Sequence, residues 1–137
     1  MKKFKGLMTS LSPHWATPKW LYDELNKEFN FDYDPCPING NLGLLIPWGK
    51  CNYINPPYGR EIIKWIERAY ITSQGGALCV MLLPSRTDTA WWHDFVMKAD
   101  EIRFIKGRLR FNESKNSAPF PSCVVIFKGK HNEKTIS

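Results

Sequence analysis

Apolar positions recur with helical spacing in three parts of the chain and predict three helices. The first helix runs from Pro18 to about Phe29, with Thr17 as its N-cap and Pro18 at the first helical position. The second begins at Arg60, in the segment REIIKWIERAYITS, where apolar residues gather on one face. The third is the segment TDTAWWHDFVMKA, residues 87–99, with Thr87 or Asp88 near its N-cap.

Shorter apolar runs between these helices predict strands. FDY (residues 31–33) and CNYI (residues 51–54) are brief and are followed by prolines, whereas GGALCVMLLP (residues 75–84) reads as a central strand buried on both faces. EIRFI, RLRF and SCVVIFK predict three further strands, with a turn at Gly107 between the first two. This alternation predicts an α/β fold with a small mixed sheet, flanking helices and a hairpin at its C-terminal end.

Length and composition are typical of one globular domain. The 137 residues, 43% of them hydrophobic, are enough to build a core, so we expect a single domain over 1–137, with flexible ends at 1–12 and 129–137. No apolar segment follows the basic start, and the run Ala77–Pro84 is too short to span a bilayer. We therefore expect a cytoplasmic protein that does not contact the membrane.

Charge and cysteine spacing indicate the kind of partner. Nineteen Lys and Arg against thirteen Asp and Glu give a net charge of +6, which favours a polyanionic partner such as nucleic acid. The four cysteines form no closely spaced pair and the three histidines complete no ligand set, so the sequence predicts reduced thiols and no metal.

Two predicted strands end in polar segments with unusual chemistry. Asp34 follows the first strand in YDPCP, and Asn55 follows the second in NPPYG. Ligands of α/β sheets bind at the carboxyl ends of the strands. Pro56 and Pro57 fix the backbone, so Asn55 and nearby carbonyls are expected to accept hydrogen bonds beside the flat ring of Tyr58. That set suits an exocyclic amino group on a planar base; the alternative is a strand terminator that leads into a helix.

Six ordered motifs make the chain similar to the phage-type Dam DNA N6-adenine methyltransferases. NPPY after a strand is the catalytic motif of amino-methyltransferases that use S-adenosylmethionine, and the full resemblance covers about residues 14–127. The motifs are WATP (15–18), YDPCP (33–37), NPPYG (55–59), LLPSRTDTAWWH (82–93), GRLRF (107–111) and APFPS (118–122).

The resemblance implies a compact, reduced Rossmann-like methyltransferase fold that uses S-adenosylmethionine and no metal. Asn55 and the Pro56 carbonyl would accept hydrogen bonds from the target amino group, with Pro57 completing the rigid turn. Tyr58 would stack on an adenine flipped out of duplex DNA. Asp34 is expected to meet the amino group of the methionine part of the cofactor. The cofactor side would comprise Trp15, Thr17, Pro18, Asp34 and Pro35.

Contacts to DNA are expected from three further segments. Arg86 could reach a phosphate or a base with Asp88 orienting it, although this stretch could also serve only as a helix cap. Arg108 and Arg110 form either a phosphate-contacting arm or a solvated hairpin. Phe120 is expected to line the base pocket.

The chain lacks the acid that holds the ribose hydroxyls of the cofactor in larger methyltransferases. The twenty residues between Asp34 and Asn55 contain no acid for the ribose hydroxyls, and Gly40 and Gly43 are the only nearby loop glycines before Gly49.

Two other functions are alternatives to DNA adenine methylation. The NPPY motif also serves amino groups of cytosine, RNA bases or protein, so the methyl acceptor could be one of these. A non-catalytic nucleic-acid-binding module is the third hypothesis.

Overall fold

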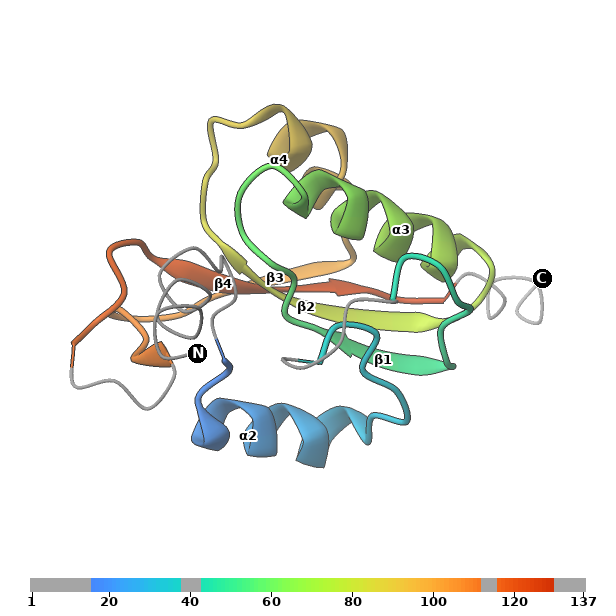
Figure 1. The fold of residues 1–137 in the computed structure, drawn as a ribbon, viewed down its shortest axis with the longest axis horizontal. Helices are drawn as coiled ribbons and strands as arrows, with labels where there is room; N and C mark the ends of the chain where they lie inside the picture. Colours follow the sequence, from blue (N-terminus) through green and yellow to red (C-terminus); the bar gives the residue numbers. More distant parts are fainter. Residues whose placement is uncertain (1–15, 38–42, 112–115, 130–137) are drawn as a thin grey trace, which may run out of the picture.

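The computed structural model describes residues 16–37, 43–111 and 116–129. Within these residues, four strands form one mixed sheet in the order β1-β2-β4-β3 (Figure 1). Helix α2 lies on one face of the sheet, and α3 and α4 lie on the other. The predicted α/β class, a mixed sheet with flanking helices, is therefore confirmed. Trp15 lies outside the described residues.

The parallel half of the sheet carries the two strand ends of interest. Strand β1 (Cys51–Ile54) pairs in parallel with β2 (Leu78–Pro84), and α3 (Ile62–Gln74) connects them. All β2 residues after Leu78 are buried, which confirms the predicted central strand. The predicted strand at 31–33 is reduced to one parallel bridge between Tyr33 and Asn52. The carboxyl end of β1 leads directly into the Asn-Pro-Pro-Tyr turn.

The antiparallel half differs from the sequence prediction in one strand. Strand β4 (Ser122–Phe127) pairs with β2 and with β3 (Glu101–Phe104), both antiparallel. The predicted strand RLRF is wrong, because residues 108–111 form no ladder with any described strand. Its side chains still alternate, with Leu109 and Phe111 buried and the two arginines exposed. The segment thus packs apolar side chains on the core without joining the sheet.

Two helix starts also differ from the prediction. Helix α2 (Lys19–Phe29) has Pro18 as its N-cap, and a proline side chain has no polar atom to cap the helix. The predicted cap, Thr17, bonds the side chains of Tyr53 and Asn55 instead. The predicted helix 87–99 is split into α4 (Ala90–Asp94) and a 3₁₀ turn, η1 (Val96–Lys98). Thr89 caps α4 by accepting from the Trp92 amide at 3.2 Å, so neither Thr87 nor Asp88 is the cap.

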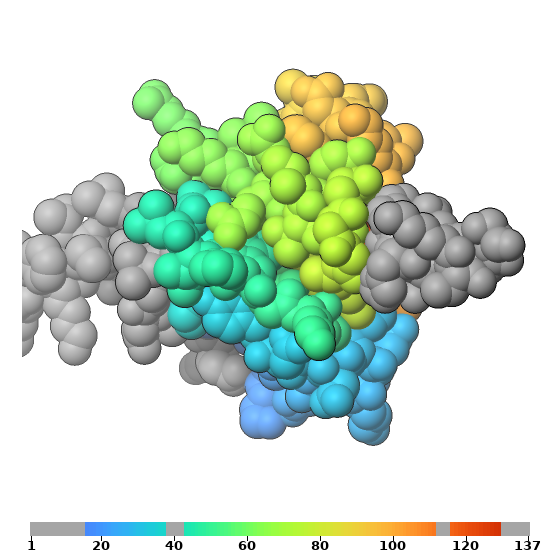
Figure 2. All heavy atoms as spheres, turned by 90° about the vertical axis from the view of Figure 1, so that its right-hand side faces the viewer, coloured from blue at the N-terminus to red at the C-terminus, as the bar shows by residue number. Residues whose placement is uncertain are grey.

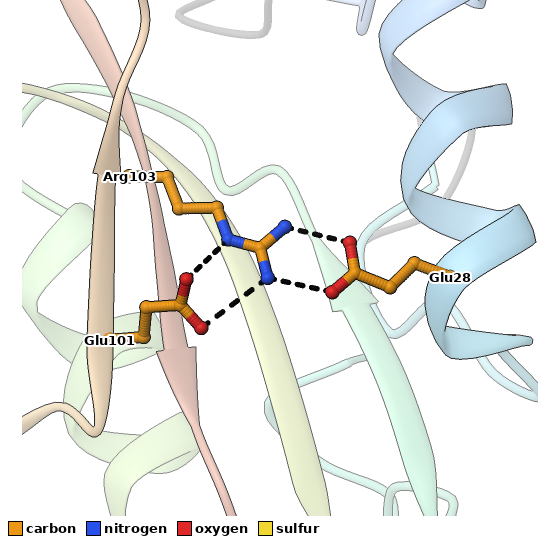
Figure 3. A network of polar contacts seen from close by, with 3 residues as sticks. All are labelled: Glu28, Glu101 and Arg103. Carbon is orange, nitrogen blue, oxygen red and sulfur yellow. Dashed lines mark hydrogen bonds and ion pairs between the residues drawn. The ribbon is translucent and has the colours of Figure 1, made fainter.

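A charged cluster joins α2 to the far strand of the sheet (Figure 3). The Arg103 guanidinium on β3 donates to both carboxylate oxygens of Glu28 on α2, each at 2.7 Å, and to Glu101 at 2.7 Å. The guanidinium also lies 5.5 Å above the Phe29 ring centroid. These contacts link the C-terminal end of α2 to β3.

The core contains the predicted apolar residues and one structural asparagine. Cys79 and Cys123 are fully buried in strands, and all four cysteines are free thiols, as the sequence predicts. The Asn52 side chain, also fully buried, bonds both backbone groups of Gly49 and the Leu78 carbonyl. Among the described residues, no helix is long and apolar enough to cross a membrane.

Candidate active site

A pocket of about 370 Å³ lies at the carboxyl end of β1, and we name it the Asn55 pocket. It joins three segments that are distant in sequence: the chain before α2, the segment around Asp34, and the strand end. Parallel strand ends are where α/β folds place ligands, so this arrangement follows the sequence expectation. The lining residues are Ala16, Thr17, Lys19, Tyr22, Asp34, Cys36, Tyr53 and Asn55.

Asn55 is held inside this pocket by a short relay of side chains. Its Nδ2 donates to Thr17 Oγ1 at 3.0 Å, and Thr17 Oγ1 lies 2.6 Å from the Tyr53 hydroxyl. Asn55 is 5% exposed and Tyr53 2% exposed, and burial raises the pKa of the Tyr53 phenol. The phenol is therefore neutral and serves as a hydrogen-bonding group.

Asp34 contributes the negative charge of the Asn55 pocket. Its Oδ1 accepts from the Cys36 backbone amide at 2.9 Å, in a turn that follows the Tyr33 bridge. The residue keeps contact with solvent, while neighbouring protein atoms remove part of the carboxylate's hydration and raise its pKa. The Cys36 amide opposes this shift. A partly desolvated carboxylate gains most from a cationic partner.

Tyr58 lies in a different pocket from Asn55. A pocket of about 350 Å³, which we name the Tyr58 pocket, is lined by Tyr58, Gly59, Ile62, Pro84, Arg86 and Trp91. The Asn-Pro-Pro-Tyr turn thus presents its first residue to one pocket and its last to another. Gly59 continues the turn at φ +116°, a left-handed conformation that favours glycine.

The Tyr58 ring is fixed by aromatic neighbours. It meets Phe120 and Phe111 edge-on, with centroid distances of 5.5 and 6.4 Å, and its hydroxyl donates to the Leu82 carbonyl at 3.3 Å. Tyr58 and Phe120 are each 8% exposed. Arg86 lies over the Phe120 ring at 5.8 Å. Phe120 is thus placed next to Tyr58, although it does not line the Tyr58 pocket itself.

The remaining predicted site residues have varied positions. Pro18 and Pro35 are buried and do not line the Asn55 pocket. Asp88 is exposed, lines neither pocket, and forms no ion pair with Arg86 in the described structure. Arg108 is exposed and donates weakly to the Ala118 carbonyl at 3.4 Å; Arg110 is exposed as well.

Five of the eight residues that line the Asn55 pocket were not predicted as site residues: Ala16, Lys19, Tyr22, Cys36 and Tyr53. Tyr53 reads as an ordinary strand residue, yet the two-residue period of a strand places it on the same face as Asn55. Tyr22 reads as part of the apolar stripe of α2, and it also lines the pocket. Gly43 is packed closely against the segment that follows Asp34, because a Cβ there would meet the Pro35 carbonyl oxygen and the Trp65 ring.

The structure also contains a pocket at the amino ends of β1 and β2, opposite the strand ends that form the Asn55 pocket. It measures about 870 Å³ and lies on the side of the molecule seen in Figure 2, between the loop before β1 and the turn after α3. None of the predicted site residues lines it. Among the described residues, no group of three or more His, Cys, Asp or Glu side chains could hold a metal ion.

The fold and the Asn55 pocket define an α/β protein with a pocket at a parallel strand end. A family model for DNA N-6-adenine-methyltransferases (Dam) matches residues 6–137. The chain belongs to this family. It is 27% identical over 139 residues to a DNA N-6-adenine-methyltransferase of Haemophilus phage HP1 (strain HP1c1), covering 85% of this chain and 79% of the relative. No solved structure matches the chain.

Proposed function

We propose that this protein methylates the N6 amino group of adenine in DNA, with S-adenosylmethionine as the methyl donor. The family and the relative's name support the reaction. The observation that carries the site assignment is the meeting of Thr17, Asp34 and Asn55 around one pocket. These residues come from three of the motifs that resemble the Dam pattern.

The side chains of the Asn55 pocket suit the cofactor. S-adenosylmethionine supplies an activated methyl group on a sulfonium, together with an ammonium on its methionine part. The partly desolvated Asp34 carboxylate would hold the ammonium by a charge-assisted hydrogen bond. Tyr22 also lines the pocket, with its ring packed against Phe31 and Tyr53. Lys19, which pairs with Asp23 at 2.6 Å, also lines the pocket and would supply a positive charge for the cofactor's carboxylate.

The Asn-Pro-Pro-Tyr turn would hold the target base. Asn55 Oδ1 and the Pro56 carbonyl would accept the two amino hydrogens, which orients the nitrogen and increases its electron density. Tyr58 would stack on the extruded adenine. Its ring now meets Phe111 and Phe120, so stacking of a base on the covered part of Tyr58 requires one of these rings to move. No side chain needs to act as a strong base, because the methylated nitrogen loses its proton to water.

A labelling experiment tests the proposal. The protein is incubated with labelled S-adenosylmethionine and unmethylated duplex DNA, and the DNA is digested to nucleosides. Label in N6-methyladenosine supports the proposal. Label in cytosine, RNA or protein substrates would change the acceptor, and absence of cofactor binding by calorimetry would leave a nucleic-acid-binding module.

Asn55→Ala is the matching variant. It removes the proposed acceptor for the target amino group, so we expect transfer to fall at least a hundredfold, to background. The fold and the cofactor affinity should remain close to those of the wild type, as measured by thermal unfolding and calorimetry. Retained turnover would contradict the role of Asn55. Asn30→Gly is the control for loss of an asparagine distant from the motif, because glycine keeps the left-handed conformation (φ +57°) of this exposed C-cap of α2.

A further inference from the structure

Tyr53, Thr17 and Asn55 form a hydrogen-bonded chain of side chains, and this chain bears on the orientation of the Asn55 carboxamide. A carboxamide has two ends of similar size and opposite hydrogen-bonding character. The target amino group is a donor, so only the carbonyl end of Asn55 can accept from it. If the side chain turned over, two amino groups would face each other.

Thr17 contacts the amino end of this carboxamide. Nδ2 donates to Thr17 Oγ1 at 3.0 Å, which turns Oδ1 to the other side of the side chain. A hydroxyl can donate as well as accept, and it would be restricted to accepting from Asn55 when its own proton is donated to the Tyr53 hydroxyl. A methyl group in its place leaves a buried N–H without this acceptor. Thr17 itself is fixed by the Tyr53 hydroxyl at 2.6 Å. Tyr53 is fully enclosed, with edge-on packing against the Tyr22 ring at 5.1 Å.

We propose that Thr17, anchored by the buried Tyr53 hydroxyl, is a positioning residue that holds the Asn55 carboxamide with its carbonyl end toward the target amino group. This inference rests on the proposed function, and it gives Thr17 a role beyond lining the cofactor side. It also assigns a function to Tyr53, whose hydroxyl makes the relay rigid. Thr17 acts through Asn55 and does not contact the reacting nitrogen.

Three variants separate positioning from simple cofactor contact. Thr17→Val keeps the shape and removes the hydroxyl, Thr17→Ser keeps the hydroxyl, and Tyr53→Phe removes only the anchor. At saturating cofactor and DNA, we expect kcat to fall about tenfold in Thr17→Val, consistent with the loss of one hydrogen bond. Thr17→Ser should stay within about twofold of the wild type, and Tyr53→Phe should lie between the two.

A second measurement follows the hydrogen bond directly, without turnover. In a ¹H–¹⁵N spectrum of the cofactor-free protein, the Asn55 side-chain amide pair is assigned by its disappearance in Asn55→Asp. We expect this pair to shift and to exchange faster with water in Thr17→Val, and to keep its position in Thr17→Ser. If only the Thr17→Val variant unfolds, Tyr53→Phe and Thr17→Ser supply the same comparison.

The outcomes are distinguishable. A wild-type protein without methyl transfer contradicts the proposed function itself. Wild-type transfer with an unchanged kcat in Thr17→Val, a weaker cofactor affinity and an unmoved Asn55 amide pair would show Thr17 to be a cofactor contact only, and the positioning role would be wrong. A fall in kcat with a shifted amide pair supports it.

Discussion

At the scale of single residues, Asp34 combines two effects that oppose each other. Partial loss of hydration raises the pKa of its carboxyl above the ordinary value, with the Cys36 amide acting in the other direction. The charged form is thus held at some cost to the stability of the free protein. A cationic ligand beside it would recover that cost on binding.

Asp34→Asn should separate stability from cofactor affinity. Loss of a hydrogen bond to a charged group is expected to weaken S-adenosylmethionine binding by about 10- to 100-fold, measured by calorimetry. The same change should raise the midpoint of thermal unfolding at neutral pH, because no charge has to be desolvated. Asp94→Asn, an exposed aspartate at the end of α4, is the control and should alter neither quantity.

The difference in stability between Asp34→Asn and the wild type should change with pH in one direction. Because the folded-state pKa of Asp34 is raised, acidification protonates the folded protein first and relieves the desolvation. The extra stability of Asp34→Asn should therefore shrink as the pH falls through that pKa toward about pH 3. Wild-type cofactor binding should weaken over the same range while binding to Asp34→Asn stays flatter. A stability difference that grows on acidification would contradict the assignment.

The strand-end argument brought Asp34 and Asn55 together, whereas Thr17 was placed on the cofactor side only by the family resemblance, because its own pattern predicted a helix cap. The sequence could not predict that Asn55 and Tyr58 would line different pockets, because that depends on the turn after Pro57. Tyr53 was missed for another reason. A buried tyrosine in a strand looks the same in sequence whether its hydroxyl has a specific partner or only a place in the core.

At the scale of elements, α2 links the pocket to the far side of the sheet. The chain before its first turn supplies Thr17, and its last turn carries Glu28, which pairs with Arg103 on β3 (Figure 3). The three members of this cluster are 35–45% exposed, so water screens their attraction. The cluster's contribution is therefore modest and depends on salt.

Glu28→Gln should lower the free energy of unfolding by at most about 1 kcal/mol at low salt, measured by urea denaturation. The difference should decrease in about 1 M NaCl, where screening is strong. The Arg103 hydrogen bonds lower the pKa of Glu28, so its contribution is present above the ordinary value of 4.5 and is lost as the pH falls through the folded-state pKa. Glu24→Gln, one turn earlier on α2 and in no ion pair with a described residue, is the control. An equal loss in both variants would exclude a specific role for the pair.

Elements with long, uniform patterns were predicted well, and those that depend on distant partners were not. The continuous apolar run of β2 is sufficient to predict a buried strand, and the apolar face of α3 is sufficient to predict an amphipathic helix. RLRF alternates like a strand, yet it does not pair along the open outer edge of β3, and its Leu109 and Phe111 side chains are buried in the core instead. The helix predicted at 87–99 breaks after Asp94, where Val96 turns into the core.

At the scale of the whole molecule, part of the positive charge of this chain, which has a net charge of +6, lies on residues 108–111. Arg108 and Arg110 project from a segment whose alternate residues, Leu109 and Phe111, are buried, and Phe111 packs against Tyr58. This basic segment therefore runs beside the proposed base site. DNA bound with an adenine near Tyr58 would bring its phosphates close to these arginines, which are too exposed to have a role in the core.

The double variant Arg108→Ala, Arg110→Ala tests this placement through salt dependence. Each phosphate contact contributes about 0.9 to the slope of log affinity against log salt, so losing two should reduce the slope by about 2. Fluorescence anisotropy with a short unmethylated duplex measures it. Lys27→Ala, Lys64→Ala removes the same charge from exposed positions on α2 and α3 and controls for net charge alone. An equal reduction in both double variants would mean that DNA responds only to overall charge. A reduction confined to the arginine variant would place the phosphate backbone along residues 108–111, beside Tyr58.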